Sequence, residues 1–346
     1  MKKVKAESIT KIAKLILEKN GVPSDQADII ADTILYAHQR GRHTHGLNRL
    51  QIYIRKINEG LMKADTDPKV ISDSKAVTVY DAENGFGQVA AYRCMQTCID
   101  KAKEYGIAAA GLRNSNNFGT AGYFGEMAAN QSMIGIAMGN AAPAIAPPGG
   151  NKSILGTNPI CFAFPSPKTD FHIVLDMATT NAARGKIRLA LRNGEKIPMG
   201  WAVDAEGNPT DDPAEALKGS LIPMGGYKGF GLSMMIDIMA GLITGSAFGG
   251  DVKNLNHPDQ FSRNGSLFIA VNTDFFMERE DYDSSIEQLI GKIRACGEEG
   301  KVTLPGEIEY NAYCENKEYV ALKETQIQDT NELAASFDID YELEVV

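Results

Sequence analysis

Residues 77–94, VTVYDAENGFGQVAAYRC, bear most directly on the fold, because they join a β-type run to a glycine motif. The motif, Gly85 to Ala90, matches the G-x-G-x-x-A pattern with which Rossmann folds hold a dinucleotide at a helix N-terminus. Two features oppose that interpretation. Gly85 lies three positions beyond the end of the β run, where a tight turn is expected, and Arg113 rather than a ribose-binding acid follows the next β run. We therefore predict a glycine-containing helix start in a non-Rossmann fold.

The chain on either side of this stretch divides into two kinds of sequence. Residues 5–62 carry apolar side chains three and four positions apart, which predicts helices. From about residue 75, short β-type runs alternate with Gly-rich and Pro-rich loops. These runs cover 76–82, 107–112, 134–139, 161–165, 172–177 and 266–271, and helical stretches cover 87–104, 120–131, 229–244, 281–296 and about 329–337.

This pattern predicts the α+β class, with an N-terminal helical domain and a mixed-sheet domain of non-Rossmann type. We expect the helical domain to comprise residues 1–74, joined by C-terminal helices from about 281–346. The mixed-sheet domain would comprise residues 75–280.

Composition and charge limit the kind of protein. Hydrophobic residues make up 43% and charged residues 23%, as in soluble globular proteins. A net charge of −9 argues against a nucleic-acid surface. The most apolar segment, residues 232–244, is too short to span a membrane and carries Asp237. The five cysteines match no zinc or redox spacing, so we expect reduced thiols and a cytoplasmic location.

A second stretch, RGRHTHGLNRLQ at residues 40–51, holds two of the five histidines. On a helix from about 45 to 60, His45 and Arg49 would share a face roughly opposite the apolar stripe. Imidazole transfers protons near neutral pH, and a guanidinium binds a carboxylate through two hydrogen bonds. The pair therefore suits the protonation of a keto oxygen next to a carboxylate. From these residues alone, a solvated helix face and a metal pair of His43 with His45 remain open.

Later motifs add to this stretch. From RGRHTHGLNRLQIYIRKINEG onward the chain resembles the type 2 malate/L-lactate dehydrogenase family, which includes sulfolactate and ureidoglycolate dehydrogenases. The resemblance continues in family order and covers residues 7 to about 307, through the motifs NSNNFGTAGYF, LGTNPICFAFP, LDMATTNAARGKI, IPMGWAVDAEGNPTDDP, GGYKGFGLSMMIDIMAGLITGSAFG and LPGE. It implies a non-Rossmann fold, NAD or NADP as cofactor, a small 2-oxo or 2-hydroxy carboxylate as substrate, and a homodimer or larger homo-oligomer.

The resemblance also implies roles for individual residues. The family's serine-histidine-glycine motif falls on Thr44-His45-Gly46, so His45 would be the general acid and base, and Thr44 would contact the substrate. Arg49 would bind the substrate carboxylate, and Thr157 would help to orient the substrate. Asn117 stands where many members have a histidine. Because an amide can hydrogen-bond but cannot titrate, proton transfer would fall to His45, and a ureidoglycolate assignment is weakened.

The cofactor contacts that the resemblance implies are spread along the chain. They are Asn140, Asp176, Met177, Ala178, Lys186, Lys228, Gly229, Pro305, Gly306 and Glu307. No metal ligand is expected. The sequence thus predicts an NAD(P)-dependent enzyme that interconverts a 2-hydroxy acid and its 2-oxo acid, with malate first and L-lactate or sulfolactate next. The alternatives are reduction of a cyclic imine-2-carboxylate, a metal-dependent hydrolase that uses His43 and His45, and a family member without activity.

Overall fold

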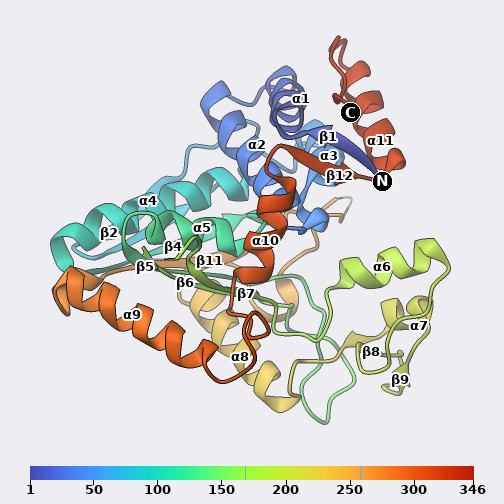
Figure 1. The fold of residues 1–346 in the computed structure, drawn as a ribbon. Coiled ribbons are helices and arrows are strands. Elements are labelled where there is room, and N and C mark those ends of the chain that lie inside the picture. Colours follow the sequence, from blue (N-terminus) through green and yellow to red (C-terminus); the bar gives the residue numbers. More distant parts are fainter. Residues whose placement is uncertain (168, 258) are drawn as a thin grey trace.

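A seven-stranded sheet lies at the centre of the computed structural model, which describes residues 1–346 except positions 168 and 258 (Figure 1). The strand order is β2-β3-β4-β11-β5-β6-β7. The strands are β2 (Lys69–Ser74), β3 (Val77–Asp81), β4 (Ile107–Ser115), β5 (Met133–Gly139), β6 (Ile160–Phe164), β7 (Ile173–Met177) and β11 (Asn264–Asn272). The six predicted β runs are confirmed, and β2 is additional.

The sheet is mixed, as predicted. Strands β3 and β4 run parallel and are joined by helix α4 (Gly87–Tyr105), whereas the other neighbours are antiparallel. Gly87 begins α4, and a Cβ atom there would lie 2.2 Å from the carbonyl oxygen of Asn116. Close packing of the helix start on that backbone therefore accounts for the glycine, as expected for a helix start outside a Rossmann fold.

Helices cover both faces of the sheet. Successive side chains along a strand point to opposite faces, and apolar side chains lie on both faces. On β11, Phe268 lies in the core under α4 and α5 (Ala121–Ala129), whereas Leu267 lies in a second cluster. That second cluster includes Ile236 of α8 (Tyr227–Asp237), which continues as a π-helical turn over Ile238–Leu242. Helix α9 (Arg279–Arg294) runs along this lower side in Figure 1. The helices predicted at 87–104, 120–131, 229–244 and 281–296 are confirmed.

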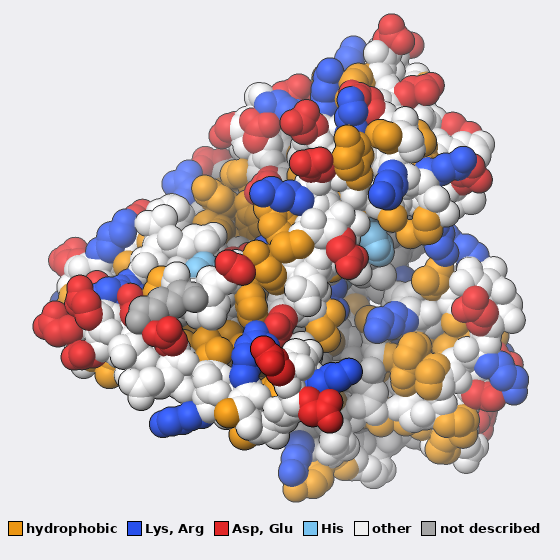
Figure 2. Space-filling view, in the orientation of Figure 1, with side chains coloured by type: hydrophobic (Ala, Val, Ile, Leu, Met, Phe, Trp, Pro, Cys, Tyr) orange, Lys and Arg blue, Asp and Glu red, His pale blue; other side chains and the backbone are white. Residues whose placement is uncertain are grey.

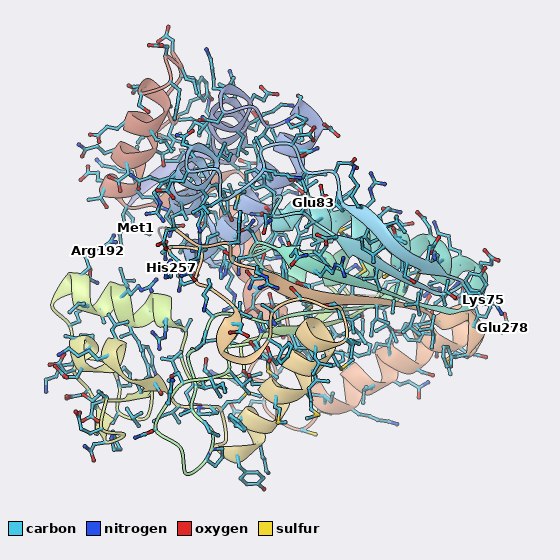
Figure 3. The ribbon with its side chains drawn as sticks, turned by 180° about the vertical axis from the view of Figure 1, so that it is seen from behind. Met1, Lys75, Glu83, Arg192, His257 and Glu278 are labelled. Atoms are coloured by element: carbon cyan, nitrogen blue, oxygen red, sulfur yellow. The ribbon has the colours of Figure 1, made fainter. Side chains whose placement is uncertain are left out.

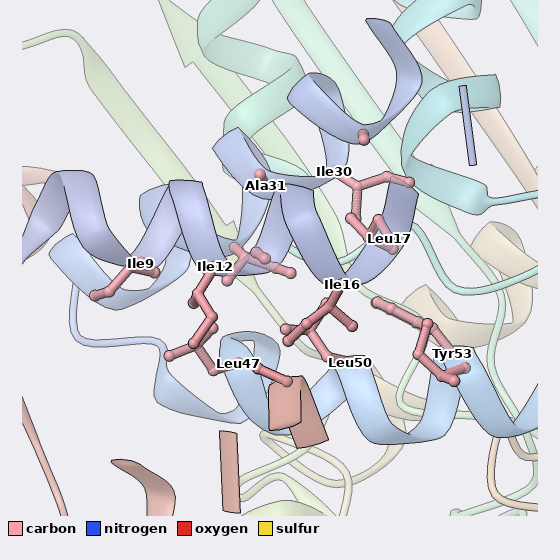
Figure 4. Close-up of a cluster of buried hydrophobic side chains, with 14 of the residues drawn as sticks. Ile9, Ile12, Ile16, Leu17, Ile30, Ala31, Leu47, Leu50 and Tyr53 are labelled. Carbon is pink, nitrogen blue, oxygen red and sulfur yellow. The ribbon is translucent and has the colours of Figure 1, made fainter. Parts of the chain in front are cut away.

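The N-terminal helices form a separate apolar core. Helices α1 (Ala6–Lys19), α2 (Ser24–Gln39) and α3 (Leu50–Asn58) enclose Ile9, Ile12, Ile16, Leu17, Ile30, Leu50 and Tyr53 (Figure 4). The chain's end returns to this core. Strand β12 (Tyr319–Leu322) pairs with β1 (Lys2–Lys5), and α11 (Glu324–Ala335) contributes Ile327 and Ala334.

Helix α10 (Glu307–Asn316) connects the sheet region to β12 and packs on α2. The domain limits near residues 74 and 280 stay predictions.

Among the described residues, no helix is long and apolar enough to cross a membrane. All five cysteines are free thiols.

A small lobe beside the sheet was not anticipated (Figure 1). It contains α6 (Arg184–Asn193), α7 (Pro213–Lys218) and the short strands β8 (Ala202–Val203), β9 (Pro209–Thr210) and β10 (Ser220–Leu221). Its own apolar core includes Ile187, Ile197 and Leu221. Helix α6 begins at Arg184, and ahead of it the hydroxyl of Thr180 donates to the carbonyl of Ala182.

Candidate active site

The segment with His45 and Arg49 is not one helix, and this corrects our prediction. Residues His43–His45 and Leu47–Arg49 form two single 3₁₀ turns, and α3 begins only at Leu50. Gly46 between them has extended backbone, with ψ −150°. His45 and Arg49 therefore do not share a helix face, although the turns still bring them together. The side-chain Nε of Arg49 donates to the carbonyl oxygen of Thr44 at 2.7 Å.

A buried histidine, His38 of α2, holds this double turn in place. Its Nε2 accepts a hydrogen bond from the backbone N–H of Leu47 at 2.9 Å, so its proton lies on Nδ1. Nδ1 lies 3.1 Å from Nδ1 of His43 and donates to it. Burial lowers the pKa of His38 to about 3, which keeps the ring neutral. This role of His38 was not predicted, because residues 38 and 47 are brought together only by the fold.

His45 has one ring nitrogen engaged and one available. Its Nδ1 lies 3.1 Å from the hydroxyl of Thr44. No described residue forms a hydrogen bond with Nε2, so this nitrogen is left for a substrate. Desolvation, and then the positive charges of Arg49 and Arg42, lower the pKa of His45 to about 3. The free imidazole is therefore neutral near pH 7 and a weak base. An anion bound beside Arg49 would offset the positive charge there and raise the pKa of His45.

Asn117 and Thr157 each accept hydrogen bonds from other residues of the chain. The Oδ1 of Asn117 accepts from the backbone N–H of Gly119, and the carbonyl of Thr157 accepts from the N–H and hydroxyl of Thr179. Among the described residues, no hydrogen bond joins either side chain to His45 or Arg49. Their contacts with substrate stay predictions.

The structure brings two predicted cofactor segments, 176–178 and 228–229, to one place. The N–H of Met224 donates to the carbonyl of Thr179, directly after Ala178. Gly229 packs so closely that a Cβ would lie 2.4 Å from the carbonyl of Met224 and 2.9 Å from that of Thr179. Only glycine permits this contact between the start of α8 and the end of β7.

Residues 305–306 contact strand β7 along the edge that does not pair with β6. The N–H of Val174 donates to the carbonyl of Pro305, and Gly306 adopts a φ of +89°. A Cβ on Gly306 would lie 3.0 Å from the nitrogen of Val174. Asp176 and Gly306 consequently line one cavity, although they are 130 positions apart in sequence.

Other predicted cofactor residues divide into exposed and engaged side chains. Lys186 and Lys228 are exposed and free to meet an anion, and Lys186 lies 5.9 Å from the centre of the Trp201 ring. In contrast, the amide of Asn140 donates to Asp237 and Ala247, and Glu307 binds Arg294 and the N–H of Leu304. Contacts from the side chains of Asn140 and Glu307 to a cofactor would compete with these bonds, and their predicted roles stay untested.

The sequence did not reveal the polar cluster beside Asp176. Arg40 forms an ion pair with Glu126 at 2.7 Å and stacks on Tyr36, whose hydroxyl donates to Glu126. Desolvation raises the pKa of Glu126 and of Asp176. A cavity of about 430 Å³ shares Arg40, Glu126 and Gly306 with the cavity at Asp176, and Phe171 and Tyr310 line it. The glutamate on α5 could not be paired with Arg40 from sequence spacing.

The proposed metal pair is not assembled as a metal centre. His43 faces His38 and His45 faces Thr44. In the described part of the chain, no three His, Cys, Asp or Glu side chains gather around a common point.

Comparison with known proteins places the chain in a family. A family model described as malate/L-lactate dehydrogenase matches residues 4–329. The chain belongs to this family. It is 37% identical over 342 residues to the L-sulfolactate dehydrogenase of Methanothermobacter thermautotrophicus, with 99% of each chain covered. It is 38% identical over 326 residues to the malate/(S)-sulfolactate dehydrogenase of Methanothermus fervidus, with 94% of this chain and 95% of the relative covered.

The sulfolactate dehydrogenase structure from Methanocaldococcus jannaschii shares the fold, with a TM-score of 0.91 at 39% identity over 98% of this chain and 99% of that one. The family is NAD(P)-dependent: relatives named for NADP⁺ and for NAD⁺ both match this chain. The malate/L-lactate dehydrogenase family therefore confirms the predicted enzyme class, fold and cofactor class.

The residues present fit a dinucleotide. A Cβ at Gly306 or Gly229 would crowd the neighbouring backbone, so these glycines allow the 305–306 and 228–229 segments to pack against β7 and the residues that follow it. Lys186 and Lys228 could neutralise phosphate charge, and the cavities beside Asp176 adjoin these segments. This chain would hold the cofactor with the 176–178, 228–229 and 305–306 segments.

Proposed function

We propose that this dehydrogenase interconverts a small 2-hydroxy acid and its 2-oxo acid, with malate/oxaloacetate and sulfolactate/3-sulfopyruvate as the first substrates to test. The observation that carries the proposal is the meeting of His45 and Arg49 around Thr44. These two side chains provide a proton-transfer group and a carboxylate-binding group within one short turn. Relatives named for malate and sulfolactate support these substrates.

In this mechanism Arg49 binds the C1 carboxylate of the substrate and fixes C2 next to His45. When the 2-hydroxy acid is oxidised, Nε2 of His45, which is neutral near pH 7, accepts the hydroxyl proton, and the substrate carboxylate beside Arg49 favours this protonation. In the reverse direction the same nitrogen returns a proton to the keto oxygen. The bound nicotinamide supplies the hydride acceptor or donor for C2. The resulting positive charge on His45 is balanced by the substrate carboxylate.

The test is turnover of reduced nicotinamide, followed by its absorbance, with NADH or NADPH and each of oxaloacetate, 3-sulfopyruvate and pyruvate. We expect wild-type turnover and a loss of about 10²–10⁴-fold in His45→Gln. His43→Gln is the matched control, because His43 lies two positions away and faces His38. Unchanged turnover in folded His45→Gln would refute the role of His45. A cyclic imine-2-carboxylate is assayed in parallel, and turnover of the imine alone would favour the imine reductase alternative.

We further propose that the protein is a cytoplasmic homodimer or larger homo-oligomer. Exposed apolar side chains on α8, the π-helical turn and α9 support self-association, since such side chains are commonly covered by a partner. They are Met234, Met235, Leu242, Ile243, Leu289 and Ile293. Light scattering after size exclusion tests this, and a monomer at all concentrations would contradict it.

A further inference from the structure

The small lobe places two more arginines beside the candidate site. Gly185, in the first turn of α6, lies so close to the His43–His45 turn that a Cβ there would be 3.1 Å from Cγ2 of Thr44. Arg184 and Arg188 flank this contact, four positions apart and therefore on one side of α6. The Thr44 backbone meanwhile binds Arg49 from the other direction. In Figure 2 the surface is hollowed between the N-terminal helices and this lobe.

The charge of these three guanidinium groups is not balanced within the described residues. Neither Arg49, Arg184 nor Arg188 has a described carboxylate within salt-bridge distance. In contrast, Arg40 and Arg113 are each paired: Arg40 binds Glu126, and Arg113 binds Asp81.

Arg184 also retains unused hydrogen-bonding capacity. One of its terminal nitrogens donates to the carbonyl of Gly219, but its Nε is buried with no partner among the described residues. Desolvation lowers the pKa of both Arg49 and Arg184, and the charge of Arg188 lowers it further in each, so Arg188 repels both of the other guanidinium groups. A buried donor without an acceptor and a set of repelling cations both favour an anion at this place.

We propose that Arg184 and Arg188 bind a second anionic group of the substrate, a carboxylate or sulfonate on C3, while Arg49 binds the C1 carboxylate. This assignment rests on the proposed function. It makes the enzyme selective for doubly charged 2-oxo and 2-hydroxy acids over pyruvate and lactate. The substrate rather than a cofactor phosphate is favoured because the contact runs through Thr44, next to His45, and not through the 176–178 or 305–306 segments.

The kinetic test compares Arg188→Gln and Arg184→Gln with Arg192→Gln. Arg192 is the matched control, since it is an exposed arginine one turn further along α6 (Figure 3). We expect KM for oxaloacetate and 3-sulfopyruvate to rise about 10- to 100-fold in the first two variants, with KM for pyruvate and for the cofactor unchanged. Arg188 is exposed, so Arg188→Gln should fold even if Arg184→Gln does not.

Two kinetic results would overturn the assignment. A rise in the KM of the cofactor alone would assign these arginines to a phosphate, and an equal change for pyruvate would remove the second anion site. Binding is measured independently of turnover as the rise in Tm caused by malonate or sulfoacetate relative to acetate. The rise should be largest in the wild type and lost in Arg188→Gln. If dianions stabilise the wild type in this way but no 2-oxo acid is turned over, the proposed function fails while the anion site stands. Equal stabilisation by acetate would refute the site.

Discussion

Replacing Gly46 by alanine should dislodge the double turn that carries His45. An alanine Cβ would lie 2.1 Å from Nε2 and 2.4 Å from Cε1 of His38, well inside van der Waals contact. His38 is fully buried and its ring is fixed at both nitrogens, so it cannot move aside without losing the bond from the N–H of Leu47. The backbone at Gly46 has a φ of −90°, which alanine tolerates, so the clash alone decides the outcome.

The magnitude follows from two contributions. Overpacking of a filled interior typically costs about 1–3 kcal/mol. An N–H of Leu47 left without its buried acceptor adds about 1–3 kcal/mol. We therefore expect Gly46→Ala to lower the free energy of unfolding by about 2–6 kcal/mol, and to reduce turnover because His45 follows the displaced turn.

Urea-induced unfolding followed by circular dichroism, together with turnover of the best substrate, provides the assay. Gly291→Ala is the matched control, because Gly291 lies within α9 and a Cβ there meets nothing within 4 Å. A helical glycine replaced in open space should change stability by no more than about 1 kcal/mol, in the stabilising direction. Wild-type stability and turnover in Gly46→Ala would refute the argument that His38 fixes the turn.

Three further predictions concern the same region. His38 has a pKa of about 3 in the folded chain against an ordinary 6.5, so its contribution to stability is complete above pH 6.5 and is lost as the pH falls toward 3. In His38→Gln, the slope of the unfolding free energy against pH, measured by denaturation between pH 6 and 4, should therefore fall by about 1.4 kcal/mol per pH unit. Asp176→Asn keeps an acceptor for the N–H of Gly122 and removes a desolvated charge, so the free energy of unfolding at pH 7 should not fall. The Kd for NAD(P)H, measured by fluorescence titration, should rise about tenfold. An unchanged Kd would exclude Asp176 from the cofactor site. Asn117→Ala removes the acceptor for the N–H of Gly119 and should cost about 0.5–2 kcal/mol in thermal unfolding, and no loss would show that the turn does not need this side chain.

Local patterns in the sequence were sufficient for the frame of the molecule. Alternating apolar residues on β11 and helical spacing in α1 and α4 appear in the structure as predicted, because each pattern is set by the geometry of one element. The motif order also identified the family, as the match over residues 4–329 confirms. The roles of His45, Arg49 and the cofactor segments stay predictions.

Only the tertiary structure decided how those residues meet. The prediction of one helix through His45 and Arg49 was wrong because the N–H of Leu47 binds His38, a partner on another helix, and this favours two short turns. The contact of Gly185 with Thr44 and the pairing of Arg40 with Glu126 likewise join segments 86 or more positions apart. Spacing along a chain fixes which side chains share a face of one element, whereas a site between elements depends on packing, and packing is determined by the whole fold.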